Sequence, residues 1–109
     1  MLFARIQEAG GALIVTPLVR ELGADAAREL REVVGERARG RSLVVVSLVD
    51  VEAIECSALA GLVAVLKQMA PGGELRLASA RGPVRALLSA TRVDGVFPLF
   101  DDAAAALAP

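Results

Sequence analysis

The sequence predicts a single α/β domain spanning residues 1–109, with a mixed central β-sheet and helices that alternate with its strands. Two observations lead to this fold class. Apolar stretches rich in β-branched residues alternate along the chain with stretches whose apolar residues recur every three or four positions. In addition, 109 residues are enough for one hydrophobic core but not for two. The expected element order is β-β-α-β-α-β-α-β-α, which is typical of an α/β layer fold.

A β-hairpin is expected at the start of the chain. The stretches LFARI (2–6) and ALIVTPL (12–18) read as short strands, and Gly10-Gly11 between them is a turn signal. Pro17 is expected at the end or the edge of the second strand, because proline has no N–H to donate to a sheet. The hairpin therefore lies at an edge of the predicted sheet.

The first helix is predicted over residues 24–39. One face of this stretch is apolar and the other is charged, and Gly35 is a weak point for a helix. The apolar face consists of Ala27, Leu30, Val33 and Val34. Arginines gather where the helix is expected to end, at positions 37, 39 and 41, with Gly40 among them. Cations favour a helix C-terminus and glycine favours the position after it, so we interpret this cluster as a helix end rather than a phosphate site.

A buried central strand is predicted by SLVVVSLVDV (42–51), which is apolar almost without interruption and rich in valine. The second helix follows it, from Cys56 to near Met69. Apolar residues at helical spacing are expected to form its buried face, namely Leu59, Leu62, Val63 and Leu66.

The remaining elements follow the same alternation. ELRLAS (74–79) reads as a strand, and Pro83 suits the first turn of a helix over 82–90. GVFPLF (95–100) is expected to be a short last strand or an extended segment. Asp101 is the predicted N-cap of a closing alanine-rich helix.

Composition excludes many functions. The chain has no histidine and one cysteine, so a zinc site of ordinary composition, a Cys–His or Ser–His nucleophile pair and an intrachain disulfide are all excluded. Phosphate-binding glycine loops are absent, and scattered charges with a net value of −1 argue against a nucleic-acid partner. We therefore expect no metal and no cofactor, and most hydrolytic and redox enzymes are excluded.

Membrane insertion is not expected either. The apolar runs are too short to span a bilayer. The N-terminal stretch carries Arg5 and Glu8, unlike a signal peptide. A cytoplasmic protein is the resulting expectation.

The chemically most distinctive feature is Cys56-Ser57, at the predicted junction of a strand and a helix. The free N–H groups and the dipole of a helix start stabilise negative charge, which suits a phosphorylated hydroxyl or an ionised thiol. Alternatively, Cys56 is a small buried hydrophobe and Ser57 caps the helix. The nearby acidic residues Asp50, Glu52 and Glu55 are interpreted as a solvated loop.

This junction and the C-terminal part of the chain resemble the STAS domains, named for sulfate transporters and anti-sigma factor antagonists. SLVDVEAIECSALAGLVAVL (47–66) resembles the family segment DLSGVxxIDSSGLxxLxxxL. The later stretches LRLAS, PVRALL, VFPLFDD and AAAAL are similar to the family's tail. The resemblance implies a non-enzymatic signal-transduction module that regulates bacterial transcription by binding an anti-sigma factor that is also a serine kinase.

Residue by residue, the resemblance assigns roles to the junction. Cys56 falls on the serine that the kinase phosphorylates in the family, and Ser57 is the alternative acceptor beside it. The other family positions fall on Glu55 and Ser47 (aspartates in the family), on Ala58 (glycine in the family) and near Gly23 (aspartate in the family). The implied partner-binding surface consists of Glu55, Cys56, Ser57, Ala58 and Leu59.

Two other functions stay open at this point. One is a STAS subunit of a membrane ABC transporter for lipids or other solutes, which requires no phosphorylation. The other is a thiol-based sensor that uses Cys56. The sequence also leaves open the partner's identity, nucleotide binding and assembly into a homodimer.

Overall fold

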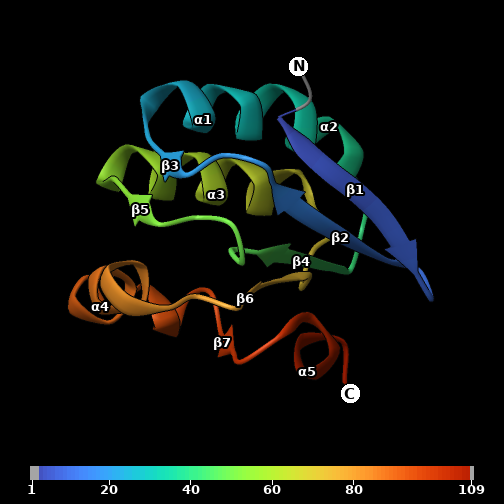
Figure 1. The fold of residues 1–109 in the computed structure, drawn as a ribbon. Coiled ribbons are helices and arrows are strands. Elements are labelled where there is room, and N and C mark those ends of the chain that lie inside the picture. Colours follow the sequence, from blue (N-terminus) through green and yellow to red (C-terminus); the bar gives the residue numbers. More distant parts are fainter. Residues whose placement is uncertain (1–2, 109) are drawn as a thin grey trace.

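Five strands form the central sheet, in the order β1-β2-β4-β6-β7, in the computed structural model, which describes residues 3–108 (Figure 1). The strands are β1 (Ala4–Ala9), β2 (Ala12–Pro17), β4 (Leu43–Ser47), β6 (Glu74–Ala78) and β7 (Leu99–Phe100). β1 and β2 are antiparallel, whereas β2, β4, β6 and β7 are parallel. The expected mixed sheet with a hairpin at its edge is confirmed. Its first strand covers residues 4–9 rather than the expected 2–6, of which Leu2 lies outside the described residues.

The hairpin turn follows from its two glycines. Gly10 and Gly11 have φ angles of 57° and 88°, the left-handed region that a two-residue hairpin turn requires and that glycine adopts without strain. Arg41 contacts the tip of the hairpin. Its guanidinium pairs with the Glu8 carboxylate and donates a hydrogen bond to the Gly11 carbonyl (3.2 Å). From the sequence, Arg41 was interpreted as part of a helix end. Its two contacts also connect the hairpin to the loop before β4.

β4 is the central strand, as predicted. Val44, Val45 and Val46 have no exposed surface. Strands β2 and β6 flank β4 in parallel, with Val44 opposite Leu13 on one side and Leu75 on the other. A strand buried on both faces needs apolar residues at every position, which explains the uninterrupted valines.

The first helical segment is continuous but not uniform. It comprises α1 (Ala24–Glu29), a π-helical turn (Leu30–Val34) and α2 (Gly35–Ala38), and Gly40 follows it with a φ of 75°. Leu30 and Val34 are buried as predicted, but Val33 is 44% exposed, so its predicted burial is wrong. A π turn contains more residues than an α turn, and this rotates Val33 away from the sheet.

Helix α3 (Cys56–Gln68) also differs from the predicted pattern. Leu62 is buried, Leu59 and Leu66 are half-buried, and Val63 is 37% exposed, so its predicted burial is wrong. The buried face is made instead by Ala58, Gly61, Leu62 and Val65. Gly61 explains the difference, because a Cβ there would lie 3.0 Å from both Cα and O of Ala27. Helices α1 and α3 thus meet through small residues, which apolar periodicity does not detect.

The C-terminal elements agree with the expectation except at one cap and in the last strand, which covers only residues 99–100 of the expected 95–100 because Gly95 belongs to a 3₁₀ turn. Helix α4 (Gly82–Ala90) has Pro83 in its first turn, and a 3₁₀ turn (Val93–Gly95) precedes β7. Helix α5 (Ala103–Leu107) is capped by Asp102, which accepts a 2.8 Å hydrogen bond from the Ala105 N–H. The predicted cap, Asp101, instead lies 3.5 Å from Arg85. Both aspartates precede the helix, and only the second has the position from which a side chain reaches the N3 amide.

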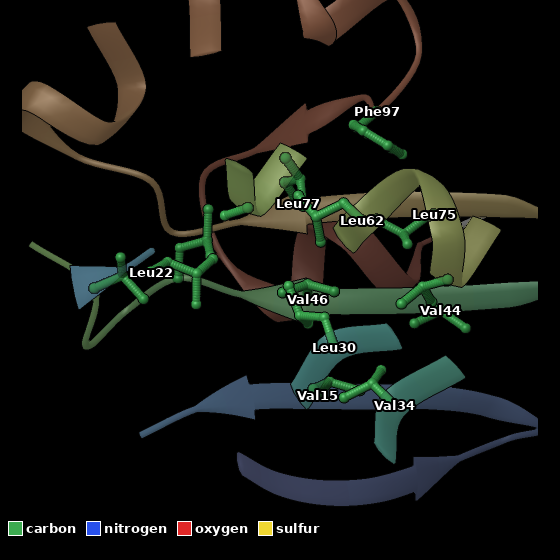
Figure 2. Close-up of a cluster of buried hydrophobic side chains, with 14 of the residues drawn as sticks. Val15, Leu22, Leu30, Val34, Val44, Val46, Leu62, Leu75, Leu77 and Phe97 are labelled. Atoms are coloured by element: carbon green, nitrogen blue, oxygen red, sulfur yellow. The ribbon is translucent and has the colours of Figure 1, made fainter. Parts of the chain in front are cut away.

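The two faces of the sheet are covered unequally. Side chains from the first helical segment and from α3 pack on one face, where Leu30 and Val34 point toward Val46 and Val15 (Figure 2). The other face is covered by α5, whose Ala106 packs against Val45 and Ala78. Arg76 holds this short helix, since its guanidinium donates hydrogen bonds to the carbonyls of Ala106 (2.7 Å) and Ala108 (3.0 Å).

A second, two-stranded sheet was not predicted. β3 (Glu21–Leu22) and β5 (Ala53–Ile54) pair in parallel, apart from the main sheet. Each strand has only two residues, too few for a recognisable alternating pattern. This small sheet nevertheless positions the junction that carries Cys56 and Ser57, because β5 leads directly into α3.

Candidate functional site at the start of helix α3

The start of α3 is fixed by backbone hydrogen bonds to the segment around β3. The amides of Glu52 and Ala53 donate to the Arg20 carbonyl (2.8 and 3.1 Å). The Glu55 amide donates to the Leu22 carbonyl (3.0 Å). Because Leu22 is fully buried, this connection fixes the position of the junction relative to the core. The side chains at the junction are therefore presented from a defined backbone.

Glu55, and not Ser57, is the N-cap residue of α3. Its backbone is extended (φ −106°, ψ 158°), and its carbonyl accepts a 3.0 Å hydrogen bond from the Ala58 amide. The Glu55 side chain makes no capping hydrogen bond. The alternative in which Ser57 serves as the cap is therefore wrong. First-turn N–H groups without a side-chain partner and the positive end of the helix dipole are left at this surface.

Three of the five predicted binding residues are exposed. Glu55, Cys56 and Ser57 present their side chains to solvent, and the Cys56 thiol is free. The alternative of Cys56 as a buried hydrophobe is therefore wrong as well. Leu59 is half-buried, whereas Ala58 is completely buried in the core and cannot contact a partner through its side chain. We call Glu55, Cys56 and Ser57 the α3-start surface.

An acidic depression borders the α3-start surface. It has a volume of about 260 Å³ and lies between β3, the beginning of α1 and Glu55. Gly23 forms part of it, and a Cβ on this glycine would lie 2.7 Å from Oε2 of Glu55. The carboxylates of Glu21 and Asp25 also line the depression, and only Asp25 has an ion-pair partner within residues 3–108, Arg28 at 3.4 Å. The surroundings of the site thus carry net negative charge.

Other residues considered from the sequence lie elsewhere. Asp50 and Glu52 line a separate depression of about 530 Å³, and Glu52 pairs with Arg20 at 3.4 Å. Ser47 is buried at the end of β4. Among residues 3–108, no three Cys, Asp or Glu side chains come together as metal ligands. None of the helices within that range has the length and apolar character needed to cross a membrane.

A family model for the STAS domain matches residues 4–106, nearly the whole chain. The chain belongs to the STAS domain family. The predicted resemblance is thereby confirmed. In this STAS domain, the junction that carries the family's characteristic segment is the same β5–α3 junction that exposes Cys56 and Ser57.

Solved structures show the same fold. A protein from Mycobacterium paratuberculosis, described as an anti-sigma factor antagonist, has 24% identity and a TM-score of 0.83, with 95% of this chain and 89% of the other covered. A putative anti-sigma factor antagonist from Thermotoga maritima has 24% identity and a TM-score of 0.80, with 93% and 88% covered. A STAS domain protein from Planctomyces limnophilus has 20% identity and a TM-score of 0.84, with 95% and 93% covered. No curated protein matches this STAS domain in sequence.

The sequence singled out residues 55–59 but not the depression beside them. Gly23 and Glu55, near or at two family positions, are neighbours in this STAS domain. Glu21 and Asp25 were not singled out, although both line the same depression as Glu55. The missing signal was the β3–β5 pairing, which brings residues 21–25 beside the start of α3.

Proposed function

We propose that this STAS domain is a non-enzymatic regulatory module of the bacterial cytoplasm that binds a kinase-type anti-sigma factor through the α3-start surface. One observation carries the proposal. Cys56 and Ser57, at the family's phosphorylation position and next to it, are exposed together on the first turn of α3, where a protein partner can reach both. The fold shared with proteins described as anti-sigma factor antagonists supports the class of partner.

Charge indicates the character of the partner's surface. Glu55 and Glu21 have no ion-pair partner within residues 3–108, and Asp25 lies in the same depression. Opposite charges across an interface speed encounter and disfavour wrong partners. A partner that docks here is therefore expected to present basic side chains toward Glu55.

Phosphorylation is expected to be absent from the native chain. Cys56 has a thiol where a serine kinase needs a hydroxyl, so the usual phosphoester cannot form there. Ser57 is displaced from that position by about 100° around the helix axis, since successive helical residues are separated by that rotation. The module therefore behaves as permanently unmodified, and its partner binding is not regulated by phosphate at this position.

The direct test is capture of a purified kinase-type anti-sigma factor from the same genome. Ser57→Arg places a bulky cation on the α3-start surface and should abolish capture. Ser89→Arg is the matched control, because Ser89 is also an exposed helical serine but lies in α4. Equal capture by both variants would refute the α3-start surface as the docking site. If the native chain binds no such kinase but captures a transporter subunit, the function as a subunit of a membrane ABC transporter is favoured instead.

A thiol-based sensor is the second candidate, because the single cysteine of the chain is exposed. Exposed thiols are accessible to oxidants and to other thiols. Mild peroxide treatment followed by intact-mass measurement tests this function. A reversible oxidation product at Cys56 that changes partner capture would support it, and capture unaffected by oxidation would reject it.

A further inference from the structure

A groove runs along the free edge of the central sheet, on elements that do not contribute to the α3-start surface. It has a volume of about 640 Å³ and is lined by residues of β1 and of the first helical segment. Figure 1 shows where these two elements lie in the fold. Ile6 and Leu18 line its strand side, and Val33 lines its helix side. Leu18 and Val33 are 37% and 44% exposed, which is unusual for large apolar side chains that lie close together.

On the helix side of the groove, an acidic and a basic residue lie at equal sequence distances from a central valine. Glu29, Val33 and Arg37 follow one another at intervals of four residues, and all three line the groove. Glu29 lies about one helical turn before Val33, and Arg37 lies about one turn after it. Neither forms an ion pair within residues 3–108, although Arg37 is near enough to Glu8 to contribute to lowering its pKa.

We propose that this groove binds a second copy of the same chain around a two-fold axis that passes beside Val33. Two-fold symmetry reverses the direction of the partner's helix. Val33 then faces Val33 of the partner subunit, and Glu29 faces Arg37 of the partner subunit. Because the symmetry repeats every contact, two such ion pairs form, one at each end of the apolar centre.

The free edge of β1 agrees with this arrangement. Within residues 3–108, β1 pairs with β2 on one side and with no strand on the other. The same two-fold axis sets the two β1 strands antiparallel, so that their unpaired backbone groups face each other. An edge strand that pairs with its symmetry mate is protected from other chains.

The charge pattern selects a second copy over an unrelated protein. An unrelated partner has no reason to present an anion and a cation at the spacing that matches Glu29 and Arg37 in reverse. The same chain presents that pattern by symmetry. The inference does not depend on the proposed anti-sigma partner, because the groove shares no residue with the α3-start surface.

Sedimentation equilibrium of the full chain and of two charge reversals tests the inference. The native chain should dimerise, whereas Glu29→Arg alone and Arg37→Glu alone should each weaken the dimer by roughly tenfold or more, since each places two pairs of like charges in contact. An equimolar mixture of the two variants should dimerise like the native chain. In the mixed dimer the arginine introduced at position 29 faces the glutamate introduced at position 37, and the native Arg37 faces the native Glu29. Both pairs thereby regain opposite charges.

Valine substitutions provide the control. Val33→Asp should abolish dimerisation because it places two carboxylates at the axis. Val96→Asp should not, because Val96 is 54% exposed but lies near β7, at the opposite edge of the sheet. A native chain that remains monomeric up to about 1 mM, where even a weak dimer is populated, would overturn the inference. A dimer whose stability is unaffected by Val33→Asp, or a mixture that dimerises no better than its components, would overturn it as well.

Discussion

The carboxylate of Glu55 lies over Gly23, so close that a Cβ on the glycine would be 2.7 Å from Oε2. Gly23 precedes α1 and Glu55 precedes α3, and both are N-cap residues with extended backbone. The STAS family has shorter aspartates at or near these two positions. Here a single, longer acidic side chain occupies the space between the two helix starts.

Gly23→Asp tests this relationship. The new carboxylate can cap α1, which favours folding, but it also displaces Glu55 and repels it. In a Glu55→Gln background the repulsion is absent. We therefore expect the substitution to be less favourable in the native chain than in the Glu55→Gln chain, by about 0.5–1 kcal/mol in the free energy of unfolding. Urea unfolding of the four proteins in this cycle measures the difference, and purely additive effects would show that the two side chains do not interact.

Ala58→Arg distinguishes the core of the junction from its surface. Ala58 is completely buried, so an arginine there has neither space nor a counter-ion, and we expect a loss of about 4 kcal/mol or more, enough to unfold the chain. Ser57→Arg changes the adjacent residue, which is exposed, and should alter stability by no more than about 0.5 kcal/mol. Thermal unfolding followed by circular dichroism compares the two. Similar melting temperatures for both variants would contradict the burial of Ala58.

Two glycine-to-alanine substitutions should have opposite effects. Gly61→Ala places a methyl group 3.0 Å from the Ala27 backbone, and we expect a loss of about 1–3 kcal/mol because backbone cannot move aside easily. Gly35→Ala meets only ordinary contacts, with Gln68 Cγ and the Leu30 carbonyl oxygen both at 3.6 Å. That substitution should stabilise the chain by about 0.4–1 kcal/mol through the lower entropy of the unfolded state. Chemical denaturation checks the signs, and a Gly61→Ala variant as stable as the native chain or more stable would show that α1 and α3 are not in close contact at Gly61.

Cys56→Ser should create phosphorylation where the native chain has none. The substitution restores the hydroxyl that a serine kinase requires at an exposed helix start. A phosphate adds roughly −1.5 to −2 charges beside Glu55. Incubation of both proteins with a kinase-type anti-sigma factor and ATP, followed by intact-mass measurement, provides the test. An adduct on the native chain that maps to Ser57 would show that the acceptor has moved by one residue.

Stability should depend on pH through the hairpin. A hydrogen bond from Arg41, together with its positive charge, holds the pKa of Glu8 below the usual value of 4.5. A lowered pKa in the folded state means that the pair stabilises the fold above pH 4.5 and that this contribution is lost as the pH falls through the lowered value. Glu8→Gln should therefore lower the melting temperature at neutral pH, and the difference from the native chain should shrink in acid.

Arg41→Gln is the control for that pH dependence. It removes the same ion pair from the other side, so its difference from the native chain should also shrink in acid. In the chain that carries both Glu8→Gln and Arg41→Gln, the pH dependence of the melting temperature should be close to that of either single variant. A pH-independent difference for Glu8→Gln would show that the carboxylate acts by packing rather than by charge.

The parts of the fold that depend on large apolar residues could be predicted from the sequence. Three consecutive buried valines identified β4, and Gly10-Gly11 identified the hairpin turn. The buried side of α3 was shifted from its expected position because Ala58 and Gly61 make the contact with α1, and small residues contribute little to a hydrophobic pattern. Val33 was misplaced because a π turn changes the helical period, and nothing in the sequence marks such a turn.

The candidate site, too, could be predicted from the sequence only in part. The position of Cys56 and Ser57 at a helix start followed from the sequence, but their exposure did not. The acidic depression depends on β3 and β5, which have two residues each and pair only because the larger core brings them together. Contacts of this kind are set by tertiary structure and leave no local pattern.

The unequal cover on the two faces of the sheet has a consequence for synthesis on the ribosome. The face of Val45 and Ala78 is covered by Ala106, which lies more than twenty residues after the last residue of β6. Chains are made at about 5–20 residues per second, so this apolar face stays open for seconds after its strands have emerged. During that interval the nascent chain exposes an apolar surface, and the arrival of α5 ends its exposure.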